Sequence, residues 1–285
     1  MLKLFDIERI NSQTIENYDN INKSYGKAQM TLQDNRTPKT VTAAMVVIGD
    51  EILSGRTQDK NVAHLATCLN EVGIQLLEVR IIPDIEQEIV DAVNFCRKKY
   101  NYVFTSGGIG PTHDDITADS IAAAFGVGID HHPEAMKILT QHYIVSGIEF
   151  NEARKRMARI PHGASLVENP VSKAPGFRIE NVFVMAGVPA IMQAMMQSIL
   201  PELTGGAKML SRSVGASVAE GIIAADLGAL QKKFPEVSMG SYPFYKQGLL
   251  GTNLVLRSVE PEKLDTAYDA LLAILAQLDA DINTT

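Results

Sequence analysis

The segment VFTSGGIGPTHDDIT, residues 103–117, decides how this sequence is interpreted. Its apolar start predicts a short buried strand. Gly107, Gly108 and Gly110 follow at once, and glycines at such a turn let backbone N–H groups surround an anion. A helix expected from Asp115 to Phe125 comes next, so the segment predicts a strand, a tight turn and a helix at a site for a phosphorylated ligand.

Two adjacent carboxylates, Asp114 and Asp115, follow the glycines. Alone they would repel an anion, but a divalent cation such as Mg²⁺ bridges carboxylate and phosphate. Thr112 and Thr117 add hydroxyl groups to the same segment. A purely structural interpretation stays open, because a Gly-rich turn is common after a strand and Asp often caps a helix.

The composition favours a globular protein with a small-molecule partner. Of 285 residues, 46% are apolar, which is enough for a substantial core, and no apolar run approaches the length of a membrane span. The net charge of −7 argues against bulk nucleic-acid binding. Cys68 and Cys96 occupy apolar helix positions, as reduced thiols in a cytoplasmic protein do. We therefore expect a cytoplasmic protein that binds neither nucleic acid nor membranes.

Three regions are expected along the chain. Residues 1–39 are polar and predict a flexible extension. Residues 40–205 alternate strands with helices, which predicts an α/β domain with a doubly wound, mostly parallel sheet. Its strands are expected at 42–48, 74–82, 102–105 and 182–186, and its helices at 62–72, 85–96, 115–125, 133–145, 152–159 and 190–200.

Gly205 and Gly206 mark the expected domain boundary. Residues 207–285 then predict a small α+β domain in the order β-α-β-β-α. Its strands are expected at 210–217, 237–242 and 253–259, and its helices at 222–234 and 261–279.

Ligands of open parallel sheets bind beyond the carboxyl ends of the strands, where four loops of this chain should meet. These loops supply the candidate binding residues Asp50, Ser54, Gly55, Asn61, Gly107, Gly108, Gly110, Thr112, Thr117, Gly187 and Pro189. Asp50, Asp84, Asp114 and Asp115 would repel one another in one cleft unless a metal binds them. For Asp84 and Asn61, capping of the next helix is the competing interpretation. Lys60 and Lys173 are candidate phosphate contacts, and His113 is either a proton carrier or a surface residue.

Four motifs together resemble the CinA-like family, whose core is the molybdenum-cofactor domain shared with MoaB and Mog proteins. They are GDEILSG at 49–55, TSGGIGPTHDDIT at 105–117, APGF at 174–177 and GVP at 187–189. The resemblance covers about residues 42–203. More loosely, GSYPF at 240–244 is similar to the small KH-like domain of that family.

The resemblance implies a three-layer α/β domain that binds molybdopterin or adenine nucleotides and forms homo-oligomers. It implies that Asp84 and Asp115 are catalytic in metal-assisted chemistry. Together with Asp114 of the acid pair, Asp84 and Asp115 are expected to hold a divalent metal, Mg²⁺ or a similar ion. Stand-alone members are associated with metal-dependent hydrolysis of ADP-ribose or FAD at the pyrophosphate. Two alternatives stay open: adenylyl transfer to molybdopterin, and a non-catalytic module that binds a pterin or nucleotide.

The chain departs from the family pattern at several positions. Val62 stands where a hydroxyl residue usually follows the Asn, and Ser172 and Lys173 replace the usual Gly region. Ala186 and Ile191 replace Pro and Glu around GVP. The separate deamidase domain of full-length CinA has no counterpart, so deamidation of nicotinamide mononucleotide is not expected.

Overall fold

The computed structural model describes residues 40–246 and 249–283, so the extension predicted at 1–39 lies outside the described residues. A six-stranded sheet has the order β2-β1-β3-β8-β7-β6. Four neighbouring strands are parallel, and the last two join antiparallel. Their bounds are Val41–Ile48 (β1), Ile74–Ile82 (β2), Tyr102–Ser106 (β3), Ser165–Val167 (β6), Gly176–Ile179 (β7) and Val182–Met185 (β8). The predicted α/β class with a mostly parallel sheet is confirmed.

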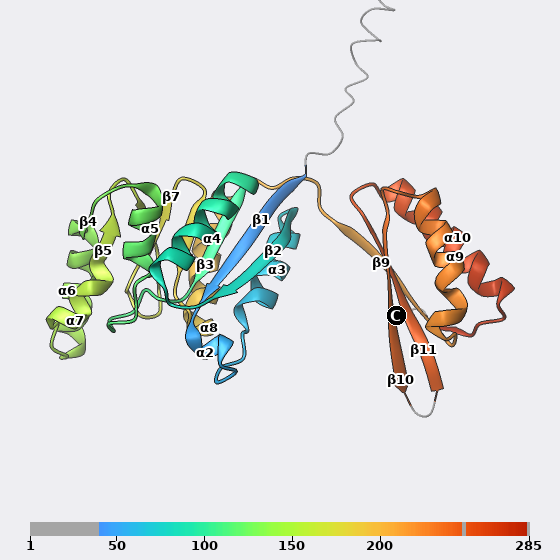
Figure 1. Cartoon of the computed structure of the whole chain (residues 1–285), viewed down its shortest axis with the longest axis horizontal. Helices are drawn as coiled ribbons and strands as arrows, with labels where there is room; N and C mark the ends of the chain where they lie inside the picture. The colour runs from blue at the N-terminus through green and yellow to red at the C-terminus, as the bar shows by residue number, and fades with distance from the viewer. Residues whose placement is uncertain (1–39, 247–248, 284–285) are drawn as a thin grey trace, which may run out of the picture. The chain divides into compact units, whose positions relative to one another are not determined.

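Strand β1 is apolar and buried at every position but Thr42 because helices cover both faces of the sheet (Figure 1). Its even-numbered side chains, such as Val46, pack in one core with α4 (Glu86–Lys99) and α5 (Thr117–Phe125). Its odd-numbered side chains, such as Met45, pack in a second core with α3 (Asn61–Glu71) and α8 (Pro189–Ile199). The short helix α2 (Asp50–Leu53) follows β1 directly. The result is a three-layer domain.

Two expectations were wrong in the segment between β3 and β6. Helix α5 begins at Thr117 rather than Asp115, which leaves both acids of the motif in a loop. The helix expected at 152–159 is only α7 (Glu152–Lys155), followed by a 3-10 turn, η1 (Arg156–Ala158). The chain then extends because β5 (Arg159–Pro161) pairs antiparallel with β4 (Ile129–His131). Helix α6 (Pro133–Ser146) lies where it was predicted, with His132 at its N-cap.

Residues 210–283 form a separate antiparallel sheet with the order β10-β11-β9-β12. Two helices pack on it through side chains such as Leu254 and Leu271. The predicted β-α-β-β-α order is present, and a short last strand, β12, was not predicted. The elements are β9 (Leu210–Ala216), α9 (Glu220–Lys233), β10 (Ser238–Lys246), β11 (Leu249–Ser258), α10 (Pro261–Gln277) and β12 (Ile282–Asn283).

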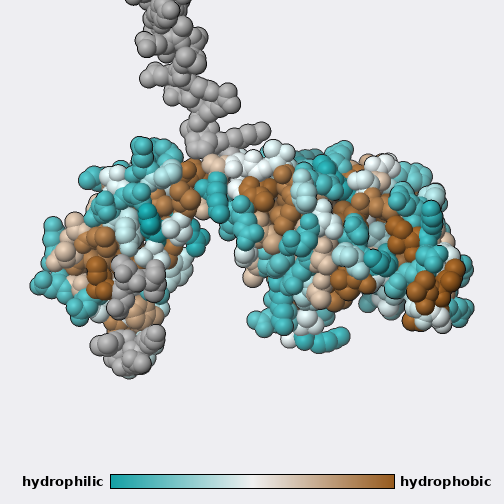
Figure 2. All heavy atoms as spheres, turned by 180° about the vertical axis from the view of Figure 1, so that it is seen from behind, coloured by the Kyte–Doolittle hydropathy of each residue, from teal (hydrophilic) through white to brown (hydrophobic). Residues whose placement is uncertain are grey.

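The described surface is mixed in character: hydrophobic residues gather in several patches between hydrophilic ones (Figure 2). Among the described residues, no helix has both the length and the apolar character that crossing a bilayer requires.

Candidate functional site

The turn after β3 has a backbone that only glycine adopts easily. Gly107 and Gly108 have φ angles of 110° and 67°. A Cβ on Gly107 would lie 2.1 Å from the carbonyl oxygen of Ile48, so no other residue fits. Thr117, the first residue of α5, fixes the turn: its hydroxyl donates to the Gly107 carbonyl and its N–H to the Gly108 carbonyl, both at 2.9 Å. Thr117 is fully buried, so its role is to hold the turn.

The same turn offers free hydrogen-bond donors. The N–H of Gly107 donates to the Met185 carbonyl at 3.1 Å. The next three N–H groups, of Gly108, Ile109 and Gly110, donate to no protein acceptor within residues 40–246 and 249–283, and these three residues are half-buried. Successive unpaired N–H groups at a turn form an anion-binding concavity. The turn therefore has free donors of the kind that bind an anion, at the carboxyl ends of the parallel strands, and phosphate binding there stays a prediction.

Asp84 lies at the end of β2 and does not cap the following helix. Its carboxylate accepts the backbone N–H of Asp50 at 2.9 Å, and α4 begins without a side-chain cap. Burial raises the pKa of the Asp84 carboxyl, and the negative charges of Asp50, Glu51 and Asp114 raise it further. A cation beside these carboxylates would relieve that repulsion.

Asp115 is oriented by its own loop. Its carboxylate accepts the N–H of Thr112 at 2.8 Å as well as the Thr112 hydroxyl, and it packs against Gly110. It does not cap α5, whose N-cap residue is Ile116. Asp114 is mostly exposed, and His113 is 98% exposed, as the surface interpretation of His113 predicts.

The three acids predicted as metal ligands are not gathered into one cluster. Across the described ranges, no group of three or more His, Cys, Asp or Glu side chains has the geometry to hold a metal ion by itself. Mg²⁺ usually takes only one or two carboxylates and completes its shell with substrate phosphates and water. The oxygen donors around Asp84 fit an ion bound in that way, together with a phosphorylated ligand.

A hollow at the carboxyl ends of the parallel strands surrounds Asn61. Its amide nitrogen donates to the Ser106 hydroxyl at 2.7 Å and to the Gly187 carbonyl at 2.8 Å. Its amide oxygen is buried and finds no hydrogen-bond partner among the described residues. Asn61 does not cap α3, because the side chain of Asp59 accepts the N–H of Val62 at 2.9 Å. A buried acceptor without a partner is suited to a ligand that brings a donor.

Other predicted residues divide between this hollow and the outer surface. Pro189 and Lys60 line the hollow with Asn61 and Gly187. Ser54 and Gly55 are exposed and lie outside its lining; the Ser54 hydroxyl instead meets the Glu51 carbonyl at 3.4 Å. The structure thus brings Asn61, Gly187 and Pro189 together and leaves Ser54 and Gly55 in a surface turn.

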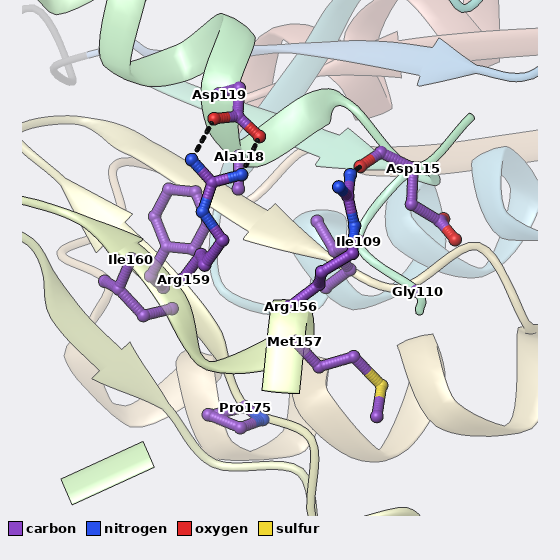
Figure 3. Close-up of a pocket in the computed structure, with 12 residues that line it drawn as sticks. Ile109, Gly110, Asp115, Ala118, Asp119, Arg156, Met157, Arg159, Ile160 and Pro175 are labelled. Carbon is purple, nitrogen blue, oxygen red and sulfur yellow. Dashed lines mark hydrogen bonds and ion pairs between the residues drawn. The ribbon is translucent and has the colours of Figure 1, made fainter. Parts of the chain in front are cut away.

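The glycine turn faces two arginines that the sequence analysis missed (Figure 3). The guanidinium of Arg159 forms a two-pronged ion pair with Asp119, at 2.6 and 2.9 Å, so its charge is neutralised. Arg156 donates only to the Asp115 carbonyl, at 3.3 Å, and its Nε is buried without a partner in the described part of the chain. Arg156 is therefore a cation with donors to spare beside Gly110.

The missed arginines carried a weak signal in the sequence. RKRMAR at 154–159 is a dense basic run in a chain of net charge −7. The expected helix over 152–159 concealed its meaning, because helical spacing does not bring Arg156 to a loop about 40 residues away in the sequence. In the structure the helix ends at Lys155, and the following segment lies along α5, where Arg159 pairs with Asp119 and Arg156 reaches Asp115.

The fold agrees with comparisons to known families and proteins. Residues 44–205 match the family described as "Probable molybdopterin binding domain", and residues 208–281 match "FAD synthase, middle domain". A protein of Pyrobaculum calidifontis is 31% identical over 249 residues, which cover 83% of this chain and 95% of that protein.

Two further relatives are named after CinA. A CinA-like protein of a Sulfurihydrogenibium species is 35% identical over 167 residues, which are 56% of this chain and 42% of the relative. The crystal structure of CinA from Thermoplasma acidophilum, a protein described as having unknown function, superposes with a TM-score of 0.53 and 30% identity. That match covers 57% of this chain and 98% of the other. A match to a protein of Aeropyrum pernix covers 62% of that relative.

Proposed function

Because this chain belongs to the molybdopterin-binding domain family, in its CinA-like branch, we propose that it is a divalent-metal-dependent nucleotide pyrophosphatase. Its substrates would be nucleotides with an internal diphosphate, such as ADP-ribose or FAD. The match of residues 208–281 to a domain of FAD synthase supports FAD as a substrate to test first.

The observation that carries the proposal is Arg156 beside the glycine turn. A diphosphate needs several hydrogen-bond donors at once. The hollow between the glycine turn and Arg156 offers the N–H groups of Gly108, Ile109 and Gly110, together with the Arg156 guanidinium, which has unused donors. Guanidinium groups suit phosphate because their planar fork binds two oxygens. Thr117 keeps the turn in shape before the ligand arrives, so little ordering is needed on binding.

In the proposed reaction, water attacks one phosphorus of the diphosphate and the P–O–P bond breaks. ADP-ribose would give AMP and ribose 5-phosphate, and FAD would give AMP and FMN. A bound divalent metal would polarise the diphosphate and lower the pKa of the attacking water. The N–H groups of the turn and Arg156 stabilise the negative charge that develops on the phosphoryl oxygens. Asp84 and Asp114 would hold the metal, and Asp115 orients the loop through Thr112.

The test is product formation from ADP-ribose and FAD by the purified full chain, with Mg²⁺ and with a chelator. Metal-dependent release of AMP that falls at least roughly 100-fold in Asp84→Asn supports the proposal. Release of pyrophosphate from ATP only when molybdopterin is supplied would instead favour adenylyl transfer. Ligand binding without any product would favour a non-catalytic binding module.

A further inference from the structure

Strand β2 forms one edge of the main sheet and pairs only with β1 in the part of the chain that the structure describes (Figure 1). Leu77, Val79 and Ile81 share one face of this strand and are 58%, 38% and 43% exposed. Natural edge strands are usually protected by lysine, proline or a covering segment. Residues 77–82, with the sequence LEVRII, contain neither lysine nor proline. The apolar row therefore lies beside an edge that is a template for a further strand.

The backbone of β2 also directs hydrogen-bonding groups out of the sheet. The Gly49 N–H, just after β1, donates to the Ile82 carbonyl at 3.1 Å, so Ile82 directs its backbone groups toward β1. The backbone groups of successive strand residues point to alternate sides, so those of Val79 and Ile81 point away from β1. Two antiparallel copies of β2 can then meet with Val79 opposite itself, where the two residues exchange both N–H···O bonds.

The charges of β2 select this register. With Val79 on the two-fold axis, Glu78 lies opposite Arg80 of the partner subunit, and opposite charges at facing positions stabilise a strand pair. The two neighbouring registers place Glu78 opposite the partner's Glu78, or Arg80 opposite the partner's Arg80, and both are destabilising. An ion pair of 2.7 Å within each chain already orders the Glu78 and Arg80 side chains. The irregularity in the pairing of β2 with β1 falls at Leu77, so these central pairs lie in the regular part of the strand.

We propose that β2 pairs with β2 of a second copy of this chain, antiparallel and with Val79 on the two-fold axis. A strand whose charges complement themselves when the strand is reversed fits a second copy better than an unrelated partner. Leu77 would then face the partner's Ile81 and extend the apolar row across the interface. Such a two-fold contact is closed, because each strand covers the other and leaves no edge there for a third copy. The interface requires nothing of the substrate, so it is independent of the proposed function.

Sedimentation equilibrium of the purified full chain tests the contact. Val79→Arg would place two positive charges opposite each other on the axis. Ile144→Arg is the matched control, because Ile144 is also an exposed apolar residue but lies on α6. The wild type is expected to be a dimer, and Val79→Arg should raise its dissociation constant about tenfold or more. Ile144→Arg should leave the dimer unchanged.

Cross-linking tests the register without relying on the charged variant. In a Val79→Cys dimer the two new side chains lie roughly 5 Å apart, whereas in Ile81→Cys they are offset by four residues, roughly 13 Å. A thiol cross-linker too short for the second distance should therefore join Val79→Cys dimers and not Ile81→Cys dimers. The natural Cys68 and Cys96 are buried, and the wild type is the control for their reaction.

Three results overturn the proposal. A monomeric wild type would leave another segment of the chain, or a different protein, to cover the apolar row. An assembly that Val79→Arg leaves intact would use another surface. Cross-linking of Ile81→Cys in place of Val79→Cys would show a different register, and the charge argument would fail. A folded Val79→Arg monomer with cross-linked Val79→Cys dimers supports the proposal, whether or not the protein releases AMP.

Discussion

Gly108 and Thr117 are packed so closely that a Cβ on Gly108 would lie 2.1 Å from the Thr117 hydroxyl oxygen. The same hydroxyl donates to the Gly107 carbonyl at 2.9 Å. The turn and the first residue of α5 thus form one unit, and the three free N–H groups of the turn depend on it. A change at either residue should alter the anion site before it alters the core.

The first prediction compares two glycines of the left-handed region. Gly126, at the end of α5, has a φ of 66°, and a Cβ added there would meet nothing within 4 Å, whereas Gly108 has a φ of 67° and the clash with Thr117. We expect Gly126→Ala to cost about 1 kcal/mol of unfolding free energy and to keep ADP-ribose binding. Gly108→Ala should cost more and weaken binding. Equal effects of both variants in denaturant titration and calorimetry would contradict this.

The second prediction concerns Arg156. Arg156→Ala should weaken binding of ADP-ribose roughly 10- to 100-fold, because it removes a charge-assisted contact to phosphate. Arg156→Lys should recover only part of the loss, since lysine lacks the planar fork. Arg154→Ala is the matched control: Arg154 lies two residues away, over the ring of Tyr143, and does not line the hollow. A loss of the same size in the Arg154 variant would show that the effect is not local.

The third prediction concerns Asn61, whose buried amide lies in the hollow with Gly187 and Pro189. Asn61→Ala removes the donors to Ser106 and to the Gly187 carbonyl, and should lower the unfolding free energy by roughly 1–3 kcal/mol. It should also weaken nucleotide binding, because the loop at Gly187 loses its anchor. Asn70→Ala, at an exposed position of the same helix, should do neither. Unchanged stability of Asn61→Ala in chemical denaturation would refute the structural role.

The fourth prediction is a pH dependence of stability away from the site. The Tyr100 hydroxyl, then Lys99 and Arg80, lower the pKa of Glu78 from 4.5 to about 2. The carboxylate therefore contributes stability above pH 4.5, and this contribution is lost as the pH falls through about 2. Glu78→Gln should lower the melting midpoint at pH 7 by roughly 2–4 °C. Its midpoint should also vary less between pH 4.5 and 2; parallel curves for both proteins would count against the assignment.

Most of the main sheet was predictable because its signals are local. The continuous apolar run of β1 predicts a strand covered on both faces, and the cores around Val46 and Met45 confirm it. Gly107 and Gly108 predict a turn that other residues cannot form, and their contacts with Ile48 and Thr117 supply the reason.

The missed parts depend on contacts between distant residues. Strands β4, β5, β6 and β7 have three or four residues each, too few for a periodic pattern to appear. The position of Arg156 is seen in its contact with the Asp115 carbonyl, and the orientation of Asp115 follows from the Thr112 contacts. The first is a contact between residues 41 apart, and the second is a local contact whose geometry depends on the loop conformation, so the sequence predicted the loop but not the cation beside it.

The central claim is that a metal ion and a diphosphate bind together at the glycine turn. Calorimetric titration of ADP-ribose with and without Mg²⁺ tests it most directly, in the wild type and in Asp84→Asn. We predict that Mg²⁺ tightens binding about tenfold or more in the wild type and hardly at all in Asp84→Asn, because coupled ligands raise each other's affinity. Equal affinity of the wild-type protein with and without the metal would contradict the account.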